Sequence, residues 1–350
     1  MDYAGLNYRN IRFPVDRSLT DEERAHRYRQ EIEGNVSPMD YLSVIKLNNG
    51  YIELVDRWYP VKGFNTWLGA CVSGFGILLT CFLVWTFVYA PAESEEQWMN
   101  WVMPILFLPF ALGFTWGGWW LMRTECSRWT HYPVRLNRKT RQVHVFRQDG
   151  TVLTVPWDAL FITLGTAKAP LSGTTYDLRA HILDADGRTV RESFTLGYPS
   201  MLGNAQSVDK FWAFLQPYME APDGVERTFC HLKEGGYLVP VDGRKESWRW
   251  SIARSFMLYA HWPWLQLLVA PVWGPITVGR MLAMWTSKQP KWPAEVEAVN
   301  VIAPDDPYQL TWRDNGPLGW WEFYWPLICT VLGVGAFLCV LIAMPVSMLG

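Results

Sequence analysis

The stretch that decides the fold is GACVSGFGILLTCFLVWTFVYA, residues 69–90, which contains no Asp, Glu, Lys or Arg. It is the centre of a longer uncharged segment, and two more uncharged segments lie at residues 97–122 and 323–350. A hydrocarbon core about 30 Å thick is crossed by a helix of about 20 apolar residues. The sequence therefore predicts three membrane helices, over residues 64–90, 101–122 and 323–350, and the first two form a hairpin within residues 63–122.

The composition agrees with a chain in which apolar and charged residues are segregated. Half of the 350 residues are hydrophobic and 18% are charged, while the formal net charge is only −2. The mean hydropathy of −0.01 averages the uncharged segments with a charged body. Many of the 22 Trp residues border uncharged segments, as they do in the aromatic belt at a membrane surface. We therefore expect an α+β membrane protein with a large water-exposed part.

A fourth uncharged stretch, residues 255–279, is open to two interpretations. Pro263, Pro271 and Pro275 should interrupt any continuous helix here. Basic residues flank both ends, and a spanning helix would put one of these clusters on the translocated side, against the usual Lys/Arg bias. An interfacial or re-entrant segment within residues 241–286 is therefore favoured over a fourth span. The choice also decides on which side of the membrane the C-terminal helix ends.

The loops predict the orientation of the hairpin. The connection between its helices carries Glu93, Glu95 and Glu96 and no basic residue, whereas Lys and Arg gather before and after the hairpin. The positive-inside rule then places the N-terminal region and the central domain in the cytoplasm, with a multi-pass chain in the bacterial inner membrane. No apolar signal-peptide core is present at the N-terminus. The six cysteines show neither zinc-ligand nor disulfide spacing, which fits a reducing compartment.

The water-exposed part divides into an arm, a central domain and a loop. Residues 1–62 are expected to form a cytoplasmic arm, with a capping box at residues 20–23 that starts a helix over residues 21–33. Residues 123–240 alternate as short strands around Asp-Gly turns at residues 148–150 and 185–187, and then show helical spacing at residues 205–218. This order predicts a small antiparallel barrel or sandwich with a C-terminal helix. Residues 287–322 are expected to form a Pro-rich cytoplasmic loop.

Two groups of residues are candidates for binding a lipid or a partner. Basic residues next to a membrane helix attract anionic lipid headgroups. The first group is the basic hairpin at the start of the central domain: Arg135, Arg138, Lys139 and Arg141. The second group belongs to the Pro-rich loop, which either docks on the central domain or presents a rigid binding surface: Lys288, Lys291, Trp292, Asp305 and Asp306.

The sequence has no pattern typical of a catalytic, cofactor or metal site. It lacks a Gly-rich phosphate loop and the GxSxG and HExxH motifs, and its six His residues are scattered. Nucleic-acid binding is not expected, because the chain is slightly acidic and shows no basic face with stacking aromatics. Gly113 and Gly117 have GxxxG spacing, which we assign to packing within the hairpin; a role in dimerisation stays open, as does the oligomeric state.

Three segments carry a resemblance to a family. They are YPVRLNRKTRQVHVFRQDGTVLTVPWD (residues 132–158), MWTSKQPKWPAEVEAVN (284–300) and PDDPY (304–308), and they follow a membrane hairpin. The chain resembles uncharacterised bacterial inner-membrane proteins often found beside type VI secretion effectors, and its central domain resembles pleckstrin-homology-like domains. The resemblance implies a non-enzymatic immunity protein that binds and neutralises an effector. The alternatives are an accessory factor or chaperone that loads an effector, and a lipid-processing or transport component.

Overall fold

The computed structural model describes residues 13–31, 36–89, 97–169, 173–197 and 204–349, so the acidic turn predicted between the hairpin helices lies outside the described residues. The chain divides into two compact units, each built from segments far apart in the sequence. The sheet unit comprises the described residues up to Val61, together with Trp129–Trp250 and Lys288–Gly319. The helical unit comprises Lys62–Arg128, Ser251–Ser287 and the described residues from Trp320 onward.

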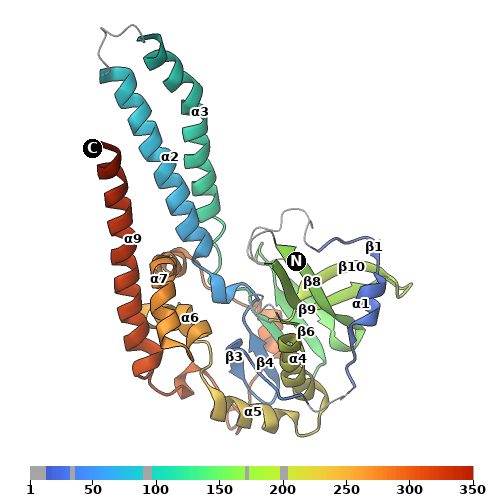
Figure 1. Cartoon of the computed structure of the whole chain (residues 1–350). Coiled ribbons are helices and arrows are strands. Elements are labelled where there is room, and N and C mark those ends of the chain that lie inside the picture. The colour runs from blue at the N-terminus through green and yellow to red at the C-terminus, as the bar shows by residue number, and fades with distance from the viewer. Residues whose placement is uncertain (1–12, 32–35, 90–96, 170–172, 198–203, 350) are drawn as a thin grey trace. The chain divides into compact units, whose positions relative to one another are not determined.

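The first sheet of the sheet unit is antiparallel and has the strand order β1-β10-β9-β8-β2. Figure 1 labels β1, β10, β9 and β8 of this sheet. Its strands are β1 (Arg17–Ser18), β2 (Arg27–Tyr28), β8 (Leu160–Ala169), β9 (Gly173–Leu183) and β10 (Thr189–Thr195). The predicted turn between β9 and β10 is confirmed. Asp186 accepts hydrogen bonds from the backbone N–H groups of Arg188 and Thr189, and Gly187 takes a positive φ of 63° that suits glycine.

The second sheet is also antiparallel, with the order β3-β4-β5-β6-β7. Its strands are β3 (Val44–Leu47), β4 (Tyr51–Leu54), β5 (Val134–Asn137), β6 (Gln142–Phe146) and β7 (Val152–Pro156). The predicted turn at residues 148–150 joins β6 to β7 and is confirmed. β4 pairs with β5 so that Tyr51 lies opposite Asn137 and Leu54 opposite Val134. This pairing joins the chain before the α2–α3 hairpin to the chain after it.

The N-terminal segment does not form the separate arm expected from the sequence. It supplies both edge strands of the first sheet and two strands of the second. The helix after the capping box, α1, covers only Asp21–Ala25, although Thr20 and Glu23 make the expected reciprocal bonds. It ends early because the next residues form β2 and pair with β8. Tertiary pairing therefore overrides the helical pattern that extends to residue 33.

One apolar core joins the two sheets. The second sheet contributes Leu54 and Val134, and the first contributes Ile162 and Phe194. The helix α4 (Ala205–Glu220) covers this core with residues at helical spacing: Val208, Phe211, Trp212 and Leu215. The helix α5 (Gly224–Gly235) follows it. The expected mixed α+β fold with antiparallel sheets and a following helix is confirmed, but in the described chain the sheets remain open and form no closed barrel.

The helical unit contains a hairpin of α2 (Phe64–Tyr89) and α3 (Gln97–Met122). Glycine lets the helices approach closely, because a Cβ on Gly69 would lie 2.5 Å from the carbonyl oxygen of Gly118. A Cβ on Gly113 or Gly117 would meet nothing within 4 Å. The close approach expected at the GxxxG pair is therefore found at Gly69 and Gly118 instead.

The fourth uncharged stretch forms a continuous helix, α7 (Pro263–Thr286). The expectation that the prolines interrupt this helix is therefore wrong. Pro263 lies in the first turn, where no backbone N–H is needed, and Pro271 and Pro275 lie inside the helix. The helix α6 (Trp248–Phe256) precedes it, and α9 (Trp325–Leu349) occupies the C-terminal segment. The remaining short helices are Tyr59–Val61, Trp157–Ala159, Met257–Tyr259, α8 (Ala294–Val299), Trp312–Asp314 and the π-helical Trp320–Tyr324.

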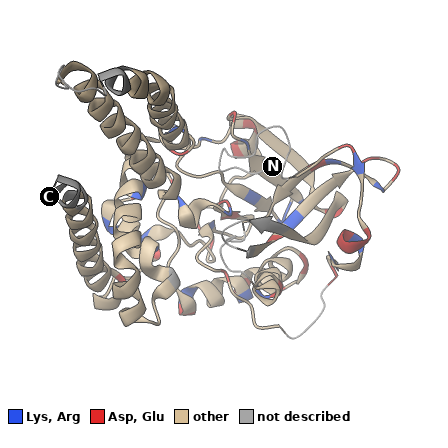
Figure 2. Ribbon diagram, turned by 45° about the horizontal axis from the view of Figure 1, so that its top comes forward, with Lys and Arg blue, Asp and Glu red and all other residues tan. Residues whose placement is uncertain are grey.

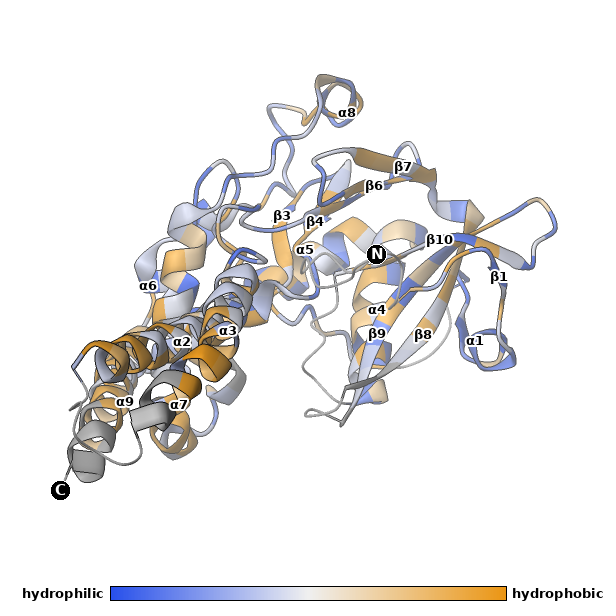
Figure 3. Cartoon of the chain, turned by 90° about the horizontal axis from the view of Figure 1, so that it is seen from above, coloured by the Kyte–Doolittle hydropathy of each residue, from blue (hydrophilic) through white to orange (hydrophobic). Residues whose placement is uncertain are grey.

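Four helical segments of the described chain are long and apolar enough to cross a membrane: Tyr59–Tyr89, Val102–Met122, Pro263–Thr286 and Trp320–Leu341. Figure 2 shows few charged residues along α2, α3 and α9. Figure 3 shows hydrophobic residues along the same helices. Only 11% of the apolar window of each hairpin helix is buried in the protein, whereas half of the α7 window is buried. The hairpin therefore presents apolar side chains outward, and α7 packs against protein over much of its surface.

Glu125, in the loop after α3, fastens the base of the hairpin. Its Oε2 accepts hydrogen bonds from the N–H groups of Gly63 and Thr66 at 2.9 and 3.0 Å and from the Thr66 hydroxyl at 2.7 Å. The carboxylate therefore caps the start of α2, where backbone N–H groups lack helical partners. Ser287, just after α7, donates its hydroxyl to the Glu125 carbonyl at 3.0 Å. One loop residue thus ties the start of α2 to the ends of α3 and α7.

A buried ionic cluster holds the sheet unit together. Asp177 on β9 is fully buried and accepts hydrogen bonds from Arg57 at 2.9 Å and from Arg179 at 3.0 Å. Arg57 is also fully buried and reaches the cluster from the N-terminal segment. Buried ions are costly to desolvate, so the loss of one partner is strongly destabilising.

Replacing Asp177 with Ala should lower the free energy of unfolding by about 3–5 kcal/mol, because buried guanidinium groups lose their counter-ion. Asp158→Ala is a matched control, since the Asp158 side chain is 58% exposed and pairs with Arg141 at the surface. The control should cost less than about 1 kcal/mol. Denaturant unfolding of the purified full-length protein in detergent measures both values, and equal losses would contradict the assignment of the Asp177 cluster as a core constraint.

Candidate functional site

The basic hairpin predicted as a binding surface is directed inward at Arg135. This side chain is fully buried, lies 2.8 Å from Glu53 and 3.2 Å from Glu297, and stacks over the rings of Tyr51 and Trp292 at 4.4 and 4.7 Å. Burial opposes the charge of Arg135, but the facing carboxylates outweigh it and raise its pKa. Arg135 therefore links β5 to β4 and to α8 and is not available to an external lipid.

Two other members of the hairpin also bond within the sheet unit. Arg138 donates to the carbonyl groups of Tyr218 and Ala221 at the end of α4. Arg141 pairs with Asp158 and with Glu220, the last residue of α4. Lys139 is exposed in the turn. Sequence reasoning missed these roles because the acceptor groups lie far away along the chain.

The Pro-rich loop docks on the second sheet, as the first of its two alternatives predicted. Leu310 exchanges backbone hydrogen bonds with Leu47 at 2.9 and 3.0 Å. Trp292 donates its ring N–H to Glu53 at 3.3 Å, and Asp306 accepts from the backbone N–H of Asn49 at 2.8 Å. Asp305 is exposed and takes no part in this docking contact. Trp292 and Asp306 thus hold the loop in place.

The two lysines of the loop remain at the surface and line an open cavity of about 510 Å³. We call this cavity the basic groove, and its lining residues are Trp129, Phe146, Gly150, Lys245, Lys288, Gln289 and Lys291. Trp129 packs edge-on against Phe146 with ring centroids 5.1 Å apart. The ring of Trp129 is fixed by a hydrogen bond from its N–H to the Gln148 carbonyl at 3.1 Å. The groove combines positive charge with an aromatic wall.

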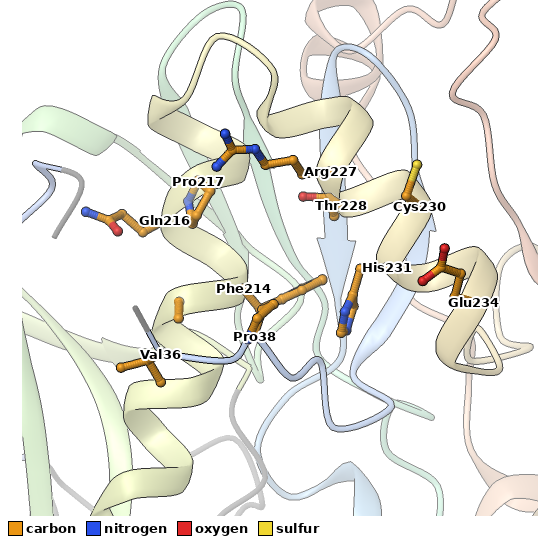
Figure 4. Close-up of a pocket in the computed structure, with 11 residues that line it drawn as sticks. Val36, Pro38, Phe214, Gln216, Pro217, Arg227, Thr228, Cys230, His231 and Glu234 are labelled. Carbon is orange, nitrogen blue, oxygen red and sulfur yellow. The ribbon is translucent and has the colours of Figure 1, made fainter. Parts of the chain in front are cut away.

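A second cavity, of about 510 Å³, opens between α4, α5 and the extended segment that precedes β3 (Figure 4). We call it the helix cleft, and its lining residues are Val36, Pro38, Ala213, Phe214, Gln216, Pro217, Arg227, Thr228, Cys230, His231 and Glu234. The ring of His231 lies 5.3 Å from that of Phe214, and its Nε2 lies 3.6 Å from Asp40. Figure 4 shows the two rings next to one another, with Cys230 directed away from them. No local pattern in the sequence indicates this cleft, because it forms where separate helices meet.

Glu23, His181 and Ser193 lie in a row that has the order of an acyl-transfer triad. His181 Nδ1 lies 2.6 Å from the Ser193 hydroxyl, and its Nε2 lies 3.2 Å from Glu23. Burial lowers the pKa of His181; burial also opposes the charge of Glu23, but bonds from His181 and Arg17 keep its pKa well below the usual range. Ser193 is only 1% exposed, so a substrate does not reach its hydroxyl. The series therefore fastens α1 to the first sheet.

No group of three or more His, Cys, Asp or Glu side chains that could hold a metal ion occurs among the residues that the structure describes. The histidines of the sheet unit instead have separate local partners. His144 on β6 faces Thr154 at 2.9 Å, and its ring lies 6.4 Å from that of Trp292. Burial, with a further contribution from the charge of Arg135, lowers the pKa of His144 to about 4.

The protein should lose stability as the pH falls from about 6.5 towards 4, in part through His144. The unfolded chain gains a proton near pH 6.5, while the folded His144 stays neutral until about pH 4, so protonation favours unfolding in this window. One such group contributes at most about 1.4 kcal/mol per pH unit. His144→Gln should flatten the pH dependence of the unfolding free energy, and His26→Gln, at an exposed position, is the control. An unchanged slope in His144→Gln would contradict this assignment.

Comparison with known proteins supplies a family but no activity. No match was found among curated proteins or among solved structures. A family of unknown function, DUF6708, matches residues 111–304, which is more than half of the chain. The match begins within α3 and ends in the Pro-rich loop. It includes every lining residue of the basic groove, and every lining residue of the helix cleft except Val36 and Pro38. The chain therefore belongs to the DUF6708 family.

Proposed function

We propose that this chain is a non-enzymatic protein of the bacterial inner membrane whose sheet unit lies in the cytoplasm and binds a protein partner. The proposed partner is a type VI secretion effector, which the chain neutralises as an immunity protein. The observation that carries the proposal is the helix cleft, an open cavity on a unit that is covalently linked to helices of membrane-crossing length. Such helices would keep the cleft at the membrane that an effector must reach.

The chemistry of the helix cleft favours a protein segment as its occupant. Apolar side chains such as Val36 and Phe214 lie beside the charged Arg227 and Glu234 in one lining. Protein interfaces combine apolar contacts with polar groups at a rim in this way. The cleft is formed by side chains from two helices and an extended segment, so a single loop or helix of a partner can contact all three.

The hydrogen bonds of the sheet unit support a topology in which α7 does not cross the membrane. Leu310, after α7, pairs with Leu47, and Asn315 bonds to Leu238, before α7. These residues must share one aqueous compartment, so the chain between Trp250 and Lys288 has to return to the side from which it left. α6 is the only long helix before α7 in this interval, and its nine residues span about 13 Å, well short of a 30 Å core.

Contacts at the two ends of α7 favour the same topology. Pro263, at its start, accepts a hydrogen bond from Trp325, which follows Gly319 of the sheet unit by six residues. Thr286, at its end, precedes Lys288 of the sheet unit by two residues. The start of α7 thus contacts a residue that is close in sequence to the sheet unit, and its end is itself close in sequence to that unit. We propose that α7 is interfacial or re-entrant, while the hairpin and α9 cross the membrane.

Cysteine labelling tests this topology. His261→Cys and Gln289→Cys flank α7, and Tyr89→Cys ends α2. A membrane-impermeant maleimide should label Tyr89→Cys in spheroplasts and the two flanking positions only in inverted vesicles, relative to the unsubstituted chain. Labelling of His261→Cys and Gln289→Cys from opposite sides would mean that α7 crosses the membrane.

Co-expression with a type VI secretion effector tests the function. The chain should protect cells from that effector, and Glu234→Arg should weaken binding by about tenfold or more, because a reversed charge in an interface costs over ~1.4 kcal/mol. Glu226→Arg is the matched control, an exposed residue of α5 that does not line the helix cleft.

Survival assays combined with pull-down of the effector separate the outcomes. Killing despite stable expression of the unsubstituted chain would overturn the immunity role. If the effector binds and its secretion falls in a deletion strain that stays resistant, the chain is a loading factor. Equal effects of Glu234→Arg and Glu226→Arg would place the partner outside the helix cleft.

A further inference from the structure

We propose that the basic groove binds the phosphate of an anionic glycerophospholipid headgroup. Lys288 and Lys291 are exposed and line the groove together with Lys245, and no acidic residue is among the described residues that line it. The two exposed ammonium groups of Lys288 and Lys291 beside one open cavity make a site for an anion. This inference is independent of the proposed immunity role, because the groove and the helix cleft share no lining residue.

The position of the groove along the chain selects a lipid as the source of the phosphate. Lys288 follows the end of α7 at Thr286 by two residues, and a chain reaches at most about 3.6 Å per residue. Lys288 therefore stays within about 7 Å of that helix end, whatever the arrangement of the two units. Trp129 follows the end of α3 at Met122 by seven residues. Lys288 is thus held near the end of one apolar helix, and a short loop joins Trp129 to another.

The aromatic wall fits the same ligand. Trp residues collect at the level of lipid headgroups, where one side of the indole is apolar and the other meets polar groups. The Trp129 ring is already oriented by its bond to the Gln148 carbonyl and its contact with Phe146. A headgroup in the groove would place its phosphate among the lysines and its glycerol against this ring.

The neighbouring arginines do not compete for this role. Arg135 and Arg141 already pair with carboxylates, and Arg138 donates to carbonyl groups at the end of α4. The two loop lysines are different, because exposure leaves their ammonium groups accessible. Each lysine next to a membrane surface contributes about a fivefold gain in affinity for anionic lipid.

Native mass spectrometry of the full-length protein in detergent tests the site. The protein is titrated with dioleoylphosphatidylglycerol, with zwitterionic dioleoylphosphatidylcholine and with inorganic phosphate. We expect saturable binding of phosphatidylglycerol alone, and about thirtyfold weaker binding in the Lys288→Gln/Lys291→Gln variant. Lys139→Gln/Lys210→Gln is the matched control, because it removes the same charge from exposed positions of the sheet unit outside the groove. Lys288→Arg/Lys291→Arg should retain binding.

Each contrary outcome overturns the proposal. Unchanged phosphatidylglycerol binding in Lys288→Gln/Lys291→Gln, or an equal loss in the control variant, would show that the groove is not the site. Equal binding of phosphatidylcholine would remove the selectivity for an anionic headgroup. Equal binding of inorganic phosphate would make free phosphate the ligand. Failure of protection in the co-expression assay bears on the helix cleft and leaves this result unaffected.

Discussion

The pairing of β4 with β5 is the contact on which the rest of the architecture depends. Tyr51 to Leu54 lie opposite Asn137 to Val134, so backbone hydrogen bonds join the chain before the hairpin to the chain after it. A sheet with one half in lipid would leave polar backbone groups unpaired, so both strands have to lie in one compartment. The hairpin must then leave and return on one side. The bond between Leu310 and Leu47 imposes the same condition on the chain through α7, and the proposed three-crossing topology is compatible with both constraints.

Buried charges specify which separated segments of the sheet unit belong together. Arg135 on β5 pairs with Glu53 from the N-terminal segment and Glu297 from the Pro-rich loop. Asp177 on β9 likewise pairs with Arg57 from the N-terminal segment. Burying such ions costs desolvation energy that their attraction offsets only when every partner is present. Their effect is therefore specificity of assembly: a segment that docks wrongly leaves a buried charge without a partner.

The sequence predicts features that depend on neighbouring residues and misses those that depend on distant ones. The long apolar helices, the Asp-Gly turns, the α4 stripe and the capping box at Thr20 all follow from local pattern. The inward direction of Arg135 does not, because its acidic partners come from other segments. Pro271 and Pro275 predicted an interrupted helix, but α7 is continuous and half of its apolar window is buried. Surrounding protein can satisfy the backbone groups that a proline leaves unpaired. The helix cleft could not be predicted, since it exists only where α4, α5 and residues 36–38 meet.

The basic residues singled out in the sequence separate by whether the fold supplies a partner. Arg135, Arg138 and Arg141 have rigid, planar groups that satisfy several acceptors at once, which suits internal bonding. Lys288 and Lys291 carry compact charges on flexible stems and remain at the surface. These three arginines thus join segments, whereas the two lysines stay exposed and carry the proposed anion site. Because the lysine site and the helix cleft have no lining residue in common, a substitution in one site should leave the other intact.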